Sequence, residues 1–106
     1  MRLTDVPIFS TLRMIRSFRD RLTQDLAAGN TPRRIPRGLA ERAVRKLFLL
    51  DTVTRLEDLG VPPGNRLEAL GGDRRGQHSI RVNEQWRICF VWRDGDAYDV
   101  EFVDYH

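Results

Sequence analysis

The spacing of apolar positions divides the chain into a helical first half and a second half with strand-like alternation. Residues 19–28 predict a short helix, because Leu22 and Leu26 fall on one face and Gly29-Asn30 follows as a stop signal. Residues 39–59 predict a longer helix, with an apolar stripe through Ala43, Leu47, Leu50 and Thr54. A Gly/Pro-rich run directly after this segment ends the helix.

From about residue 65 onward the period of the apolar positions changes from helical to two. Alternating runs predict strands at 66–70, 78–82, 86–92 and 98–103, and a shorter run precedes the first helix at 14–18. Asn83-Glu84 and Asp94-Gly95 separate the later strands, and Asp-Gly is a strong hairpin signal. Helices followed by a meander of strands predict an α+β fold, with two N-terminal helices packed on a small, mostly antiparallel sheet.

The last hairpin predicts which side chains share a sheet face. A two-residue turn at Asp94-Gly95 would pair Arg87 with Phe102 and would place Arg87 on the same face as Asp104 and His106. Such a cluster is either an Arg87–Asp104 salt bridge that pins the last strand or an arginine aimed at a phosphate. A bulge in this hairpin would reverse the parity.

The same reasoning applies to the other residues near this end of the sheet. A two-residue turn at Asn83-Glu84 would add Ile80 and His78 to the face of Arg87, and His78 is interpreted as a packing or surface residue. Tyr105 is expected on the opposite face. The imidazole of His106 is the side chain best matched to proton transfer at neutral pH.

Charge adds a candidate class of partner. The 106 residues form one domain by length and carry a net charge of +3, with 18 basic residues of which Lys46 is the single lysine. Arginine binds phosphates with a planar fork, so a polyanion such as RNA is a plausible partner, although a GC-rich gene would also favour arginine. For Arg42, Arg45 and Lys46, a solvated helix face is favoured over RNA contact.

Other chemistry receives little support from the sequence. The single cysteine, Cys89, cannot form an internal disulfide and is interpreted as a small buried residue, which favours a reducing compartment such as the cytoplasm. No apolar run approaches the length of a membrane span. No metal-ligand spacing or phosphate-binding glycine loop is present, so no metal or other cofactor is expected. Residues 1–13 are interpreted as an extension before a functional start at Met14, with a true N-terminal element as the alternative.

Several short motifs together resemble one known family. They are residues 63–70 (PGNRLEAL), 72–74 (GDR), 79–80 (SI), 85–90 (QWRICF) and the final 104–106 (DYH). In order and spacing they are similar to the HigB-type toxins of the RelE/ParE superfamily of bacterial type II toxin–antitoxin systems. The resemblance covers 14–106, and it implies a small antiparallel sheet with helices packed on one side.

The resemblance also implies an activity. HigB-type toxins are ribosome-dependent mRNA endoribonucleases that inhibit translation and growth without a metal: the ribose 2′-hydroxyl attacks the adjacent phosphate and expels the 5′-oxygen. Such a reaction needs a base, a cation for the phosphorane and an acid for the leaving oxygen. By motif, His106 would transfer protons and Arg87 would hold the scissile phosphate, while Asp104 and Tyr105 would orient the nucleotide or assist the histidine. RNA contacts would come from Arg66, Arg74 and Arg75.

The chain departs from the family pattern at two positions. Glu68 stands where many members have a histidine, and Gly71 stands where many have a lysine. Glu68 could serve as the general base, but a carboxylate is a weaker base than an imidazole. The resemblance therefore implies a competent but slow or mild toxin.

The family also implies partners, and it leaves two competing functions open. The expected partners are a HigA-type helix-turn-helix antitoxin, the ribosome and mRNA, with operator DNA contacted only through the antitoxin and no membrane involved. One alternative is a ParE-like toxin that poisons DNA gyrase. The other is a non-catalytic basic RNA-binding module, for which Trp86 and Trp92 would be the stacking candidates, although core or interface packing is favoured for both.

Overall fold

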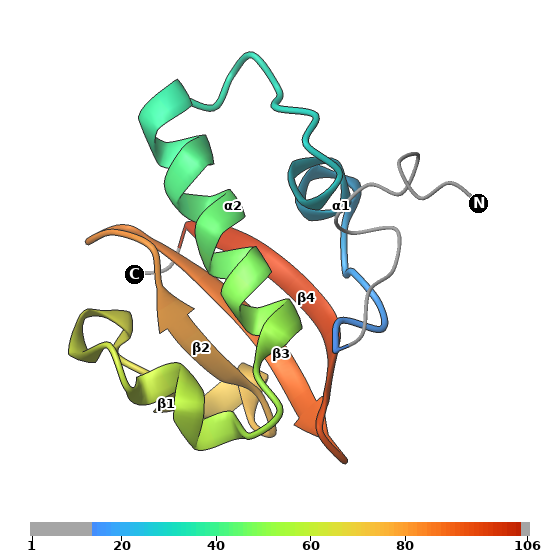
Figure 1. Cartoon of the computed structure of the whole chain (residues 1–106), viewed down its shortest axis with the longest axis vertical. Helices are drawn as coiled ribbons and strands as arrows, with labels where there is room; N and C mark the ends of the chain where they lie inside the picture. Colours follow the sequence, from blue (N-terminus) through green and yellow to red (C-terminus); the bar gives the residue numbers. More distant parts are fainter. Residues whose placement is uncertain (1–13, 105–106) are drawn as a thin grey trace.

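The computed structural model describes residues 14–104, which form two helices packed on a four-stranded antiparallel sheet (Figure 1). Helix α1 spans Arg21–Ala27 and helix α2 spans Arg37–Thr52. The sheet order is β1-β2-β3-β4, with bounds Glu68–Ala69, His78–Arg81, Trp86–Arg93 and Asp96–Asp104. The predicted α+β meander is confirmed.

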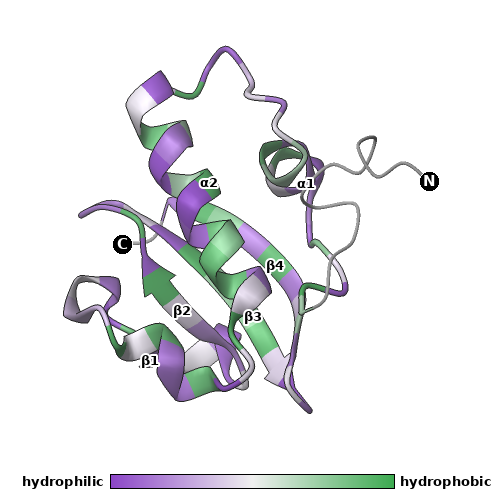
Figure 2. Ribbon diagram, in the orientation of Figure 1, coloured by the Kyte–Doolittle hydropathy of each residue, from purple (hydrophilic) through white to green (hydrophobic). Residues whose placement is uncertain are grey.

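Both helices lie on one side of the sheet, and the apolar core fills the space between the two layers. Figure 2 shows hydrophobic segments along β3 and β4 and hydrophobic residues interspersed with hydrophilic ones on α2. The largest fully buried core side chains include Leu26, Leu47, Leu50, Ile80, Ile88, Phe90, Val100 and Phe102. Trp86 stacks on Phe102 at 4.5 Å between ring centroids, so its core-packing interpretation is confirmed.

Three predicted elements are shorter in the structure. The prediction of a helix over 39–59 was wrong at its end, because α2 stops at Thr52 and Leu56–Gly60 forms a separate 3-10 turn. The run Thr52-Val53-Thr54 is β-branched, and such residues lose side-chain freedom in a helix. The predicted strand over 66–70 is reduced to Glu68–Ala69, and the 14–18 run forms only two isolated bridges to β4.

A bulge in β4 overturns the predicted register of the last hairpin. The turn itself is as expected: Arg93 pairs with Asp96, and both Asp94 and Gly95 have positive φ. Between the pairs Val91–Tyr98 and Cys89–Glu101, however, β3 advances by two residues and β4 by three. Asp99, with φ of 53°, lies in this extra step.

Beyond the bulge every side chain of β4 lies on the opposite face from that expected. Arg87 pairs with Val103, and Asp104 pairs with Trp86. The prediction that Asp104 shares the face of Arg87 was therefore wrong. His106 and Tyr105, which the same argument placed, lie outside the described residues.

The first hairpin also differs from its prediction. The Val82 N–H donates to the Trp86 carbonyl at 2.9 Å, and Arg81 pairs with Arg87, so the loop has three residues, 83–85. Ile80 consequently pairs with Ile88 and faces the core, and the prediction that Ile80 and His78 share the face of Arg87 was wrong. His78 packs against Phe90, as the packing interpretation expected.

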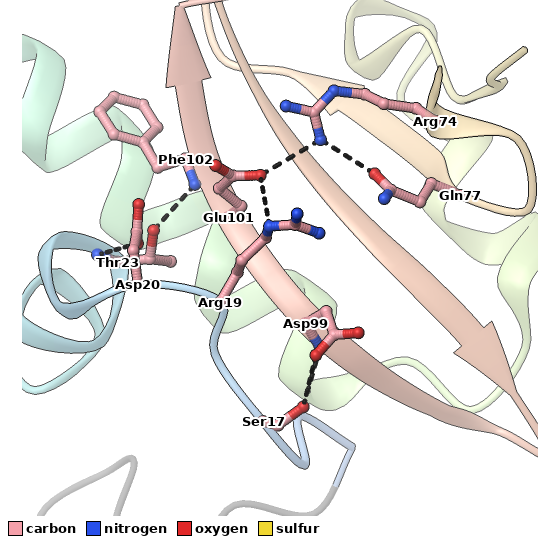
Figure 3. Close-up of polar contacts among 9 residues, drawn as sticks. All are labelled: Ser17, Arg19, Asp20, Thr23, Arg74, Gln77, Asp99, Glu101 and Phe102. Carbon is pink, nitrogen blue, oxygen red and sulfur yellow. Dashed lines mark hydrogen bonds and ion pairs between the residues drawn. The ribbon is translucent and has the colours of Figure 1, made fainter. Parts of the chain in front are cut away.

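The segment before α1 covers the outer edge of β4. Ile15 and Phe18 form parallel bridges to Ala97 and Val100. Figure 3 shows the contact of Ser17 with Asp99, and it shows Thr23 of α1, whose Oγ1 accepts the Phe102 N–H at 2.8 Å. The strand edge is thereby protected from pairing with another chain. No helix within 14–104 is both long and apolar enough to cross a membrane.

Candidate phosphate-binding site

Arg87 is held in place by hydrogen bonds from two neighbouring segments. Its Nε donates to Ser79 Oγ at 2.7 Å, and its Nη2 donates to the Arg66 carbonyl at 2.6 Å. Arg66 has a left-handed backbone (φ 45°) at the end of the 3-10 turn Pro63–Asn65. Only 9% of Arg87 is exposed, and within 14–104 its Nη1 group has no hydrogen-bond partner. The guanidinium is therefore oriented by the protein and keeps donors available for an anion.

Arg81 lies directly opposite Arg87, and this pair was missed from the sequence. The two arginines are cross-strand partners on the sheet face that points away from the helices. Like charges in this position repel each other, so the arrangement is costly unless an anion lies between or beside them. A three-residue loop at 83–85 would have revealed the pair, but the loop length was not evident from the sequence.

A pocket of about 350 Å³ opens beside this pair. It is lined by Arg66, Arg81, Arg87, Asn83 and Glu84. The Arg81–Glu84 ion pair is long, at 3.9 Å, and the Glu84 side chain is 94% exposed, so it neutralises little of the charge. Three arginines around one pocket can bind a phosphate by charge-assisted hydrogen bonds.

Glu68 is the acidic side chain nearest to the Arg87 guanidinium among the described residues. Its Oε1 lies 4.0 Å from Arg87 Nη2, and its side chain is 53% exposed. Glu68 is on β1, paired with Ser79, which is also the hydrogen-bond acceptor of Arg87. A carboxylate at this distance can accept a proton beside a bound phosphate without closing off the guanidinium.

Arg74 and Arg75, also predicted to contact RNA, lie in or next to the 72–75 turn. Arg74 Nη1 donates to Gln77 Oε1 at 3.0 Å and pairs with Glu101 at 3.2 Å, and Glu101 also pairs with Arg19 (Figure 3). These bonds attach the 72–75 turn to the open face of the sheet. Arg75 is exposed.

Asp104 lies on β4 and Cys89 lies on β3, the two strands of the last hairpin. Asp104 accepts a 2.9 Å hydrogen bond from Gln85 Nε2, and no salt bridge to Arg87 forms. Cys89 is fully buried, as expected, and this burial raises the pKa of its thiol; Glu101 adds to the rise while Arg74 and Arg87 oppose it. Within 14–104 no three His, Cys, Asp or Glu side chains come together as metal ligands would.

Comparison with known proteins identifies the family. Residues 16–106 match the family described as the RelE-like toxin of type II toxin–antitoxin system HigB. The chain belongs to the HigB-like toxin family. As a toxin of this family, it has an antitoxin as its partner.

Individual HigB relatives agree with this membership. The chain is 45% identical to Toxin HigB-1 of Vibrio cholerae serotype O1 over 74 residues, covering 70% of this chain and 77% of the relative. It is 34% identical to Endoribonuclease HigB of Proteus vulgaris over 93 residues, covering 88% of this chain and all of the relative. A gyrase poison and a non-catalytic RNA-binding module are not favoured by these matches.

Proposed function

We propose that this HigB-like toxin is an endoribonuclease that cuts mRNA on the ribosome and so inhibits translation and growth. The observation that carries the proposal is the opposed pair Arg81–Arg87, which lines one pocket together with Arg66. The name of the Proteus vulgaris relative, Endoribonuclease HigB, supports the same activity.

The proposed reaction is attack of a ribose 2′-oxygen on the adjacent phosphorus. A base removes the 2′-proton, the 5′-oxygen leaves with a proton from an acid, and the products are a 2′,3′-cyclic phosphate and a 5′-hydroxyl. Arg87 would neutralise the charge that builds up on the phosphorane oxygens, because its guanidinium is already oriented before substrate binds. Arg81 would share this charge.

Two residues, His106 and Glu68, would transfer the protons of this reaction. His106 would protonate the leaving 5′-oxygen, since an imidazole titrates near neutral pH. Glu68 would act as the base, as its Oε1 lies 4.0 Å from the guanidinium that holds the phosphate. Asp104 and Tyr105 would orient the nucleotide or assist His106. Because a carboxylate is a weaker base than an imidazole, we expect slow cleavage and mild toxicity.

The proposed partners follow from the same function. RNA contacts would come from Arg66 and Arg75, while Arg74 would hold the 72–75 turn in place through Glu101. The ribosome would present the message in the cytoplasm. The antitoxin would be a HigA-type helix-turn-helix protein that contacts operator DNA for the pair.

The test is induction in bacteria, with growth and mRNA 5′-ends as readouts. We expect cuts inside translated codons with the natural chain and none with His106→Ala or Arg87→Ala. Arg93→Ala is the matched control, because Arg93 is an exposed arginine on the same strand that stacks over Tyr98. Arg87→Lys and circular dichroism separate loss of the guanidinium from loss of the fold. Intact mRNA with the natural chain, or undiminished cutting by both variants, would refute the proposal.

A further inference from the structure

A second basic pocket lies between α2 and the hairpin that joins β2 to β3. It has a volume of about 470 Å³, and its charged lining comprises Arg42, Arg45 and Lys46 from α2, Arg81 from β2, and Glu84. Four cations thus surround one pocket, and Glu84 is its single acidic lining residue. The solvated-face interpretation of the three α2 residues does not account for their convergence on Arg81.

The charges of this pocket are held close together by the fold. Residues 42, 45 and 46 follow the i, i+3, i+4 spacing that places side chains on one helix face. Lys46 is anchored by a hydrogen bond from its Nζ to Oδ1 of the buried Asn65. Burial, and then the charges of Arg42 and Arg45, lower the pKa of Lys46. A bound anion would relieve this repulsion.

This pocket adjoins the pocket of Arg87. Both are lined by Arg81, Asn83 and Glu84. Strand β1 pairs only with His78 and Ser79, so within the described part of the chain no strand covers the outer edge of β2 at Arg81. The Arg87 pocket opens on the face away from the helices, whereas the second pocket contains α2 residues. A ligand can therefore pass around this sheet edge from one pocket to the other.

We propose that the α2 pocket binds a backbone phosphate of the same RNA strand whose scissile phosphate lies at Arg87. The proposal rests on the nuclease function above and extends it to the path of the substrate. Single-stranded RNA fits better than a duplex, because it can bend around the edge at Arg81 while a rigid A-form helix cannot. An acidic protein segment is the competing ligand, and the test includes it.

The first measurement is the salt dependence of binding to a 2′-O-methyl RNA strand of about 12 nucleotides, which lacks the attacking hydroxyl. Arg42→Gln/Arg45→Gln should lower the slope of log K against log salt by about 0.7, the value for one lost phosphate contact on a single strand. The control, Arg33→Gln/Arg34→Gln, removes the same charge from the exposed loop between the helices and should leave the slope nearly unchanged. A trinucleotide should bind equally to all three proteins.

Lys46 provides a second, direct readout because it is the single lysine of the chain. In protein labelled with ¹⁵N-lysine, one side-chain signal reports its titration. Adding the 12-nucleotide strand should raise the pKa of Lys46, and so should Arg42→Gln/Arg45→Gln without RNA. An unchanged Lys46 titration on RNA binding would overturn the proposal.

The outcomes separate this proposal from the nuclease function. Equal slopes for natural and Arg42→Gln/Arg45→Gln protein, together with mRNA cutting by the natural chain, would refute the α2 pocket alone. A lowered slope without mRNA cutting would refute the nuclease function and retain the RNA path. If Arg42→Gln/Arg45→Gln weakens only the binding of duplex RNA, the pocket binds a duplex and the proposal is overturned. If the same variant binds RNA normally but forms a weaker complex with the antitoxin, the pocket binds a protein and the proposal is likewise overturned.

Discussion

Arg87 on β3 donates a 2.7 Å hydrogen bond from its Nε to Oγ of Ser79 on β2. This bond and the one from Arg87 Nη2 to the Arg66 carbonyl hold the guanidinium in place at the pocket that Arg87 lines with Arg66 and Arg81. Ser79 is itself fully buried. The serine is thus a positioning residue for the proposed phosphate site.

Replacing Ser79 should weaken cleavage beyond its effect on stability. Ser79→Ala leaves the buried Nε without its acceptor, which should lower the free energy of unfolding by about 1–3 kcal/mol. Misorientation of Arg87 should reduce cleavage on the order of ten- to a hundredfold. Ser79→Thr retains the hydroxyl and should restore cleavage. Urea unfolding and mRNA end mapping measure the two effects, and equal cleavage by Ser79→Ala and natural protein would contradict the positioning role.

The bulge at Asp99 should tolerate glycine but not a β-branched residue. Asp99 has φ of 53°, and its N–H donates to Ser17 Oγ at 2.8 Å, a bond that any residue can make. Asp99→Gly should leave the urea midpoint unchanged or raised, whereas Asp99→Val should cost about 1–2 kcal/mol. Both effects are read from the urea unfolding midpoints of the two variants beside the natural protein. An Asp99→Val variant as stable as Asp99→Gly would contradict this account of the bulge.

Asp51 should be one of the most stabilising polar residues. Its side chain is buried, and Oδ1 accepts from the Met14 and Ile15 N–H groups at 3.2 and 3.1 Å. Asp51→Ala should lower the free energy of unfolding by about 3 kcal/mol, because two backbone donors lose a charged acceptor. Asp51→Asn keeps an oxygen and should cost less. Asp25→Ala, which removes an exposed ion pair with Arg21, is the control and should have little effect.

Cys89 should make the protein less stable in alkaline solution. Burial raises the pKa of its thiol, so the folded state binds the proton more tightly than the unfolded chain. Stability from this group is therefore complete below the unfolded pKa and declines from about pH 8.5 upward. Cys89→Ala should lower stability at neutral pH and abolish this part of the alkaline decline. Urea midpoints between pH 7 and 10 measure it, and identical slopes for both proteins would contradict the prediction.

The antiparallel sheet and the identity of Arg87 as the candidate phosphate ligand were predictable from local sequence signals. Alternation gave the strand positions, and Asp94-Gly95 gave the last turn, because these signals depend on neighbours in the chain. The end of α2 was missed because a β-branched run ended the helix earlier than the Gly/Pro run did.

The grouping of the site residues depended on the tertiary structure. One extra residue at Asp99 and one in the 83–85 loop moved Asp104 away from Arg87 and brought Arg81 opposite it. Side chains alternate with a period of two, so a single inserted residue transfers everything beyond it to the other face. The sequence by itself determined the family, the strands and the arginine. Only the packed sheet, with α2 across one face, decided which cations share a pocket, because that depends on registers set by the core and on contacts between distant segments.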